Sequence, residues 1–275
     1  MGEGGTTSSA TRWDPAIVDV AQMDCLESLI WIDQHQTVHP MLALNWTYHP
    51  RQDEGDMAGG VAAISFNLRQ GVTFHDGSEF NATVVKWNYD RVINISAYVD
   101  QKWYGRNWFN PAGLESRYTS TWNLSWAGND PFSTGGTIPF INETIVVSRY
   151  VVNVTLNKWA MTVYNSAFGL GMGSMISMEA YKPWQWKAIY GFGDDPSFPQ
   201  DNPALFPGHL IGTGPLVFDY QDKVVTQVGK AHKNLNYWNR IALTAAGRGT
   251  VDDFYYRFFA TADSRTNALL NGEID

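Results

Sequence analysis

The sequence of 275 residues predicts an α/β fold, and three observations support that prediction. Hydrophobic residues make up 44% of the chain and charged residues 17%, which is typical of a globular protein with a proper core. Residues 64–92 change from the two-residue period of a strand to the spacing of a helix. Residues 143–156 carry two short β-branched runs on either side of a turn, which is typical of a β-hairpin.

The first of these segments predicts a strand, a turn and a helix in that order. Apolar residues alternate with polar ones from Ile64 to Arg69, so one side of the strand should be buried. Asp76-Gly77 tolerates the left-handed backbone of a reverse turn, and the side chain of Asn81 can cap the first helical turn. One helix face should be buried, because apolar residues follow at helical spacing: Val85, Tyr89 and Val92.

The N-terminal part of the chain and its composition exclude several classes of protein. Residues 1–11 lack the basic start and apolar centre of a signal peptide, so we interpret them as a linker. Residues 25–30 are interpreted as a short helix. No apolar run approaches the roughly 20 residues needed to span a bilayer. The net charge of -8 argues against nucleic acid as a partner. The lone Cys25 permits neither an intramolecular disulfide nor a thiolate metal cluster.

The chain carries a surplus of N-x-S/T sequons, which are the acceptor sites of N-glycosylation. About two would be expected by chance from the Asn, Ser and Thr content, and six are present. The surplus predicts a protein exposed on the outside of the cell, and chance sequons in a Thr-rich chain are the alternative. Asn81 is also the predicted helix cap, so the glycosylation candidates are the other five: Asn45, Asn94, Asn123, Asn142 and Asn153.

Residues 66–77 carry the longest motif in the chain. They resemble the hallmark F-x-L-R-x-G-V-x-F-H-D-G of the extracellular solute-binding proteins of family 5, the receptors of peptide, nickel and some oligosaccharide ABC importers. Four other segments resemble this family in the expected order: P-x-L-A-x-x-W at residues 40–46, G-T-G-P at 212–215, N-x-x-Y-W at 234–238 and G-E-I-D at 272–275. The chain departs from the family pattern at Leu216, where Tyr is usual, and at Leu235, where Pro is usual.

The resemblance implies a particular architecture. We expect a lobe like those of type II periplasmic binding proteins, with mixed sheets and an inserted α/β subdomain. Residues 1–47 and 161–275 would form a discontinuous inner subdomain, and residues 48–160 the inserted one. In the family the G-E-I-D element lies near the hinge and a second lobe follows, so we expect that the second lobe is absent from this chain.

Aromatic residues are the predicted ligand contacts. In the family the first strand borders the cleft and a tyrosine after the hallmark helix reaches the ligand, which makes Trp13 and Tyr98 candidates. Residues 94–142 lack regular periodicity and are rich in aromatic residues, which offer large, rigid contact surfaces. Within this segment we also expect Trp103, Tyr104 and Trp108 to bind ligand. The alternative is that such side chains fill a small core beneath the loop.

Catalytic motifs are weak in this sequence. His35 and His39 lack the Glu of H-E-x-x-H, and Gly169, Gly171 and Gly173 have the wrong spacing for a dinucleotide loop. The Asp pairs at 194–195 and 252–253 could serve a sugar-cleaving enzyme only if folding brought two carboxylates together, and adjacent Asp residues are more often turn residues. We therefore predict no enzyme activity, no metal site and no cofactor. His75 and Asp76 are predicted to be structural turn residues.

The resemblance implies the substrate-binding component of an ABC importer, which captures extracellular oligopeptides in a cleft between two lobes. Its partners would be the ligand and the permease subunits, and an anchor not present in this chain would hold it at the cell surface or in the periplasm. An oligosaccharide receptor is the alternative, because the 12 tryptophans offer surfaces on which sugar rings stack. A glycan-decorated surface protein and a sugar-cleaving enzyme are alternatives from other classes.

Overall fold

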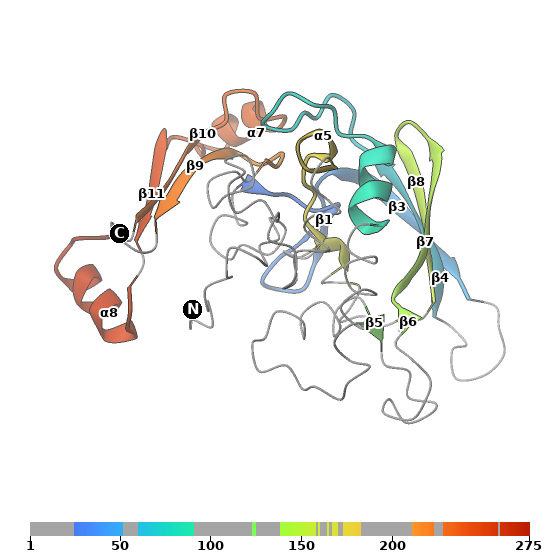
Figure 1. The fold of residues 1–275 in the computed structure, drawn as a ribbon, viewed down its shortest axis with the longest axis horizontal. Helices are drawn as coiled ribbons and strands as arrows, with labels where there is room; N and C mark the ends of the chain where they lie inside the picture. The colour runs from blue at the N-terminus through green and yellow to red at the C-terminus, as the bar shows by residue number, and fades with distance from the viewer. Residues whose placement is uncertain are drawn as a thin grey trace, which may run out of the picture.

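The computed structural model describes residues 25–51, 60–90, 123–124, 138–157, 159, 164, 167–169, 173–182, 211–222, 228–257 and 259–275. These residues form two larger sheets, two short two-stranded sheets and several helices (Figure 1). Every strand pair within these ranges is antiparallel. Together with the helices, the sheets confirm the mixed α/β class expected from the sequence.

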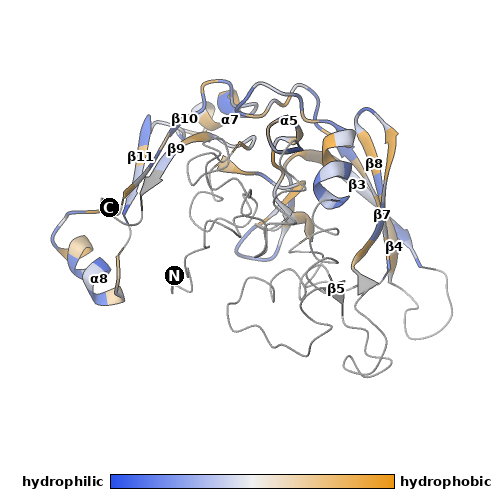
Figure 2. Ribbon diagram, in the orientation of Figure 1, coloured by the Kyte–Doolittle hydropathy of each residue, from blue (hydrophilic) through white to orange (hydrophobic). Residues whose placement is uncertain are grey.

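The larger sheet has four strands in the order β3-β4-β8-β7. Hydrophobic residues are prominent along its strands, whereas α7 and α8 carry both hydrophilic and hydrophobic residues (Figure 2). Ile64 and Phe66 of β4 and Val152 and Val154 of β8 are fully buried, which is the alternation that the sequence predicts for a half-buried sheet. The strand bounds are Ala43–Pro50 for β3, Val61–Leu68 for β4, Ile141–Ser148 for β7 and Val151–Leu156 for β8.

A helix at residues 82–90 packs on the buried face of this sheet. Its residues Val85 and Tyr89 belong to the same hydrophobic core as Phe66. Phe168 lies at the centre of this contact: its ring centroid is 5.2 Å from that of Phe66 and 5.7 Å from that of Tyr89. The predicted burial of one helix face is therefore confirmed for these two positions, and Val92 lies outside the described residues.

The second sheet has three strands in the order β11-β10-β9. A smaller core that includes Trp87 and Ile176 joins it to the rest of the chain through Phe218 of β9 and Ala231 of β10. The strand β9 spans Leu216–Asp222, β10 Val228–Lys233 and β11 Asp253–Arg257, and the helices are α5 Met178–Tyr181, α7 Arg240–Ala245 and α8 Ala262–Leu270. The short strands are β1 Ile30–Ile32, β2 Val38–Pro40, β5 Asn123–Leu124 and β6 Ile138–Pro139.

Two sequence-based expectations need comment. The short helix predicted over residues 25–30 is wrong from Leu26 onwards, because Glu27 forms an antiparallel bridge with Met175 and Ile30 begins β1. The division into an inner subdomain (1–47 and 161–275) and an inserted one (48–160) stays a prediction. Its first boundary falls inside β3, a continuous strand that pairs with β4.

Candidate functional site

The predicted ligand contacts Trp13, Tyr98, Trp103, Tyr104 and Trp108 all lie outside the described residues. The structure instead describes the place where the sequence motifs meet. We call the cluster of Glu27, Arg69, Thr213, Tyr237 and Trp238 the Glu27 junction. Its members come from four segments that are far apart in the sequence: the start of the chain, the hallmark, the G-T-G-P turn and the N-x-x-Y-W segment.

The carboxylate of Glu27 is the centre of this junction and is 3% exposed. The Thr213 hydroxyl and the Trp238 indole nitrogen each donate to Glu27 Oε2 at 2.8 Å. The Tyr237 hydroxyl donates to Glu27 Oε1 at 2.7 Å. A buried carboxyl group needs such donors. Burying even a neutral polar group without a hydrogen bond costs on the order of 2–7 kcal/mol, and burying a charged one costs more. Both oxygens are occupied, so this group is a structural acceptor.

Charge and burial act in opposite directions on Glu27. Removal from water raises the pKa of the Glu27 carboxyl, and the three hydrogen bonds and the nearby Arg69 charge oppose that rise only in part. Burial and the neighbouring Glu27 carboxyl also raise the pKa of the Tyr237 hydroxyl, which therefore keeps the proton that it donates. The Arg69 guanidinium lies over the Trp238 ring at 4.4 Å from the centroid, and its Nε donates to the carbonyl of Met41.

His75 of the hallmark turn binds the main chain of the G-T-G-P turn. The amide of Gly212 donates to His75 Nδ1 at 3.3 Å, and the amide of His75 donates to the Gly212 carbonyl at 2.8 Å. His75 Nε2 donates to the Gly214 carbonyl at 3.1 Å. Since Nδ1 accepts and Nε2 donates, this geometry suits a neutral imidazole with its proton on Nε2. The contacts support the prediction that His75 has a structural role.

Asp76 shapes the same turn. Its Oδ1 accepts from the amide of Ser78 at 2.9 Å and from the Ser78 hydroxyl at 2.6 Å, and its Oδ2 accepts from the Ser177 hydroxyl at 2.5 Å. Ser177 is also the N-cap of α5, so the turn is attached to the start of that helix. Gly77 follows with φ +83°, which is the left-handed conformation expected from the Asp-Gly pair.

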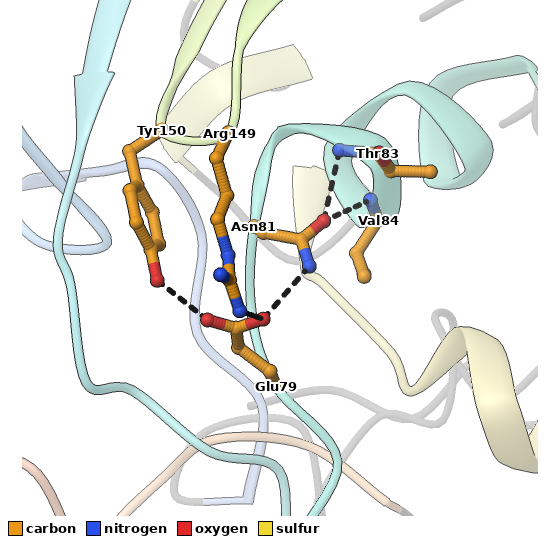
Figure 3. A network of polar contacts seen from close by, with 6 residues as sticks. All are labelled: Glu79, Asn81, Thr83, Val84, Arg149 and Tyr150. Atoms are coloured by element: carbon orange, nitrogen blue, oxygen red, sulfur yellow. Dashed lines mark hydrogen bonds and ion pairs between the residues drawn. The ribbon is translucent and has the colours of Figure 1, made fainter.

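A third cluster joins the segment just after the hallmark to the turn between β7 and β8 (Figure 3). Arg149 Nη2 donates to Glu79 Oε2 at 2.7 Å, and the Tyr150 hydroxyl donates to Oε1 at 2.5 Å. These two donors, with a weaker one from the Asn81 amide nitrogen, lower the pKa of Glu79 to about 2. Asn81 Oδ1 accepts from the amides of Thr83 and Val84, which confirms its predicted role as the helix cap.

The helix that follows is held by a buried amide. Asn88 is 2% exposed, and its Nδ2 donates to the carbonyls of Val84 and Ile176, both at 3.0 Å. The amide of Ile176 in turn donates to Asn88 Oδ1 at 3.2 Å. The side chain thus binds the main chain of Ile176 as a neighbouring strand would, and it fixes the hallmark helix to the segment that leads into α5.

The other candidate residues in the described part of the chain have ordinary polar partners. His39 Nε2 pairs with Asp33 at 2.9 Å, Lys233 pairs with Asp252 at 3.3 Å, and Lys230 pairs with Asp253 at 2.8 Å. Within the described ranges no group of three His, Cys, Asp or Glu side chains could hold a metal ion. No helix within the same ranges is long and apolar enough to cross a membrane.

Sequence reasoning missed the Glu27 junction. The available signal was a single acidic residue inside the largely apolar run from Cys25 to Ile30, where a charged side chain needs a buried partner. Its partners could not be identified beforehand, because Thr213, Tyr237 and Trp238 follow about two hundred residues later, at separations of 186, 210 and 211 residues.

Comparison with known proteins accounts for this convergence of motifs. The family model described as "Bacterial extracellular solute-binding proteins, family 5 Middle" matches residues 37–275. The chain belongs to this family. The residues matched by this family 5 model include the hallmark and every later motif of the Glu27 junction, and Glu27 itself precedes them.

Curated relatives and solved structures agree with the family. The glutathione-binding protein GsiB of Salmonella typhi is 24% identical over 247 residues, which cover 90% of this chain and 35% of GsiB. The binding protein DppA from Helicobacter pylori in complex with the peptide STSA aligns with a TM-score of 0.60 at 19% identity and covers 95% of this chain. AgaA from A. tumefaciens R10 in complex with agropinic acid aligns with a TM-score of 0.61 at 18% identity and covers 98%.

These structural neighbours are type II periplasmic binding proteins, which confirms the fold class expected for this family 5 chain. The chain spans about a third of GsiB, namely 35% of its length. It spans 43% of the DppA chain and 41% of the AgaA chain. Relatives of this family 5 chain therefore have much more sequence than the region aligned with it.

Proposed function

We propose that this chain is part of the substrate-binding component of an ABC importer and that the component captures oligopeptides outside the cell. The observation that carries the proposal is the family match over residues 37–275. Oligopeptides are favoured because GsiB is named for glutathione, itself a small peptide, and because DppA was solved with the peptide STSA. The relatives are binding proteins, which favours a function without catalysis.

The ligand contacts in this proposal are Trp13, Tyr98, Trp103, Tyr104 and Trp108. Extended peptides bind through main-chain hydrogen bonds and through pockets for alternate side chains, and aromatic residues can line such pockets. We place the cleft between the lobe formed by this chain and a second lobe. In this arrangement the Glu27 junction takes no direct part in binding; it joins the segments that carry the family motifs.

The proposed partners are the permease subunits, which would accept the ligand from the receptor. The proposed location is outside the cell or in the periplasm, where an anchor would hold the receptor at the cell surface. The family description, which specifies extracellular proteins, supports the location. The net charge of -8 is consistent with a small-molecule receptor and unfavourable for nucleic acid.

Calorimetry on the complete gene product tests the proposal. A pool of dipeptides to pentapeptides should bind, whereas pools of malto- and cello-oligosaccharides should not. The sugar pools are included because the 12 tryptophans favour an oligosaccharide as the second candidate. The variants Tyr98→Ala and Trp103→Ala should weaken binding about tenfold or more, because truncating a central aromatic contact costs roughly 1–2 kcal/mol or more.

Tyr220→Ala provides a matched control, because Tyr220 is 45% exposed on β9 and lies outside the predicted contacts. It should leave peptide affinity unchanged. Binding of sugars without peptides would replace the proposal by the oligosaccharide receptor. Absence of binding to every pool would reject a receptor for either class and would favour a role as a surface protein.

A further inference from the structure

The six sequons are confined to one part of the chain. All of them fall between Asn45 and Thr155, and residues 156–275 contain none. Three of the six acceptor residues lie on strands of the four-stranded sheet: Asn45 on β3, Asn142 on β7 and Asn153 on β8. The structure therefore allows these sequons to be compared by the surroundings of the acceptor side chain.

On β3 and β4, the face of this sheet that points away from the core carries polar side chains, whereas on β7 the exposed Ile145 lies opposite Asn153. Asn67 donates to Asn45 at 2.5 Å, and the Ser65 hydroxyl donates to Asn153 at 3.2 Å. In the pairing register, Thr47 of β3 lies opposite Ser65 of β4, which in turn lies opposite Asn153 of β8. The polar side chains on β3 and β4 suit contact with a hydrated sugar chain.

Two acceptors are committed to structural contacts. Asn81 caps the helix with its oxygen and donates to Glu79 with its nitrogen at 3.3 Å. Asn153 is only partly exposed and lies on a strand with neighbours on both sides. At a third site, Asn142 donates to the Thr155 hydroxyl at 3.2 Å, and the Thr144 hydroxyl that completes its sequon is on a fully buried residue.

Asn45 combines features that none of these three sites has together. It is exposed, and so is Thr47, the hydroxyl residue of the same sequon. The contact with Asn67 uses the oxygen of Asn45, so the amide nitrogen remains for attachment. Asn45 also lies on β3, an edge strand of the sheet, beside a register irregularity between residues 43 and 45. An edge strand can be approached by an enzyme from its unpaired side.

We propose that Asn45 is an N-glycosylation site and that the glycan is attached to the folded chain. In the reaction, the amide nitrogen of Asn45 bonds to the anomeric carbon of an oligosaccharide carried on a lipid phosphate. The bond from that carbon to the phosphate oxygen breaks, the lipid phosphate leaves, and the amide loses one proton. The sugar then covers the outward face of the β3-β4-β8-β7 sheet, opposite the core.

Mass spectrometry of the protein purified from the organism that encodes it tests this site. The peptide that contains Asn45 should carry a hexose-containing glycan, and the peptides with Asn81 and Asn153 should be unmodified. Asn45→Gln and Thr47→Val should each lower the intact mass by one glycan. Thr47→Ser keeps the hydroxyl and should retain the glycan. Asn153→Gln should also retain the glycan, so that its intact mass differs from that of the wild type only by the mass of the substitution.

An unmodified Asn45 in the native protein would overturn the proposal, as would a glycan at Asn81 or Asn153 in place of Asn45. A glycan that survives Thr47→Val would also contradict it, because attachment would then be independent of the sequon. The readout is independent of ligand binding, so the result holds whether or not the chain proves to be part of a peptide receptor.

Discussion

Replacing Glu27 by alanine should destabilise the folded chain severely. The change leaves three donors without an acceptor: the buried hydroxyl of Thr213 and two partly buried groups, the hydroxyl of Tyr237 and the indole nitrogen of Trp238. Each unsatisfied donor costs about 1–3 kcal/mol, and water that enters the vacated space recovers part of this, so the loss should total about 3–5 kcal/mol. Such a loss is a large share of the about 5–15 kcal/mol that stabilises a typical domain.

Glu27→Gln separates the hydrogen bonds from the charge. The glutamine oxygen can accept from Trp238 and Thr213, and its amide can donate to the Tyr237 hydroxyl, which turns to accept. We expect a loss of less than about 1 kcal/mol at neutral pH, near the net value of one neutral hydrogen bond.

The pH dependence of Glu27 follows from the direction of its pKa shift. Because burial raises the pKa of Glu27, the folded chain retains a proton on this carboxyl at pH values where the unfolded chain has released it. This contribution to wild-type stability is fully present below the ordinary pKa of 4.5 and is lost as the pH rises through the folded-state pKa. The Glu27→Gln variant has no such carboxyl and does not lose this contribution. The difference between its free energy of unfolding and that of the wild type should therefore shrink as the pH rises.

Urea unfolding between pH 4.5 and pH 8, followed by tryptophan fluorescence and circular dichroism, measures both variants. The slope of the unfolding free energy with urea should be unchanged, so that a shifted midpoint reports stability. A Glu27→Gln loss as large as that of Glu27→Ala at pH 7 would mean that the charge itself is required, which contradicts the raised pKa. A Glu27→Ala loss below about 1 kcal/mol would show that the three hydrogen bonds contribute little.

Three further predictions concern the hallmark and the turns around it. Glu79→Gln should lower the free energy of unfolding by about 1 kcal/mol at pH 7, because the contact between Glu79 and Arg149 is partly exposed and screened. In unfolding scans the difference in stability from wild type should vanish as the pH falls from 4.5 to about 2. A difference that stays constant over this range would contradict the lowered pKa of Glu79. Gly77→Val should lower the free energy of unfolding by about 1–3 kcal/mol, because the φ of +83° at this position disfavours a β-branched residue. The choice of ligand, measured by calorimetry, should be unchanged. A stable variant with altered specificity would contradict a structural role for Gly77. Gly212→Ala should lower the melting temperature more than Gly71→Ala. A Cβ at Gly212 would lie 2.1 Å from the carbonyl oxygen of Cys25, whereas a Cβ at Gly71 meets no atom within 4 Å and is disfavoured only by a φ of +74°. Equal shifts would show that the clash at Gly212 is relieved until it costs no more than the positive φ at Gly71.

Local structure in this chain was predictable where one segment contains its own signal. The alternation from Ile64, the Asp-Gly turn and the Asn81 cap each depend on residues within a few positions of one another, and the structure confirms all three. The hairpin predicted over residues 143–156 is confirmed as β7 and β8, for the same reason.

Long-range structure was not predictable in the same way. The run from Cys25 to Ile30 has the composition of a helix, but the main chain of Glu27 pairs with Met175, which no local pattern indicates. The burial of Glu27 likewise depends on donors that only the fold brings near. The ligand contacts expected from the aromatic segment stay predictions, because Trp13 and Tyr98 lie outside the described residues.

Several contacts between the motifs of this chain join a side chain to main-chain atoms, which bears on how far such sequences can diverge. His75 contacts the backbone of Gly214, and so does Asn234 at 2.9 Å, while Asn88 contacts the backbone of Ile176. A carbonyl or amide is offered by almost every residue type, so the receiving position can accept substitutions without losing the contact. A small set of retained polar side chains can then preserve the architecture during extensive sequence drift. This chain superimposes on DppA with a TM-score of 0.60 although only 19% of the aligned residues are identical.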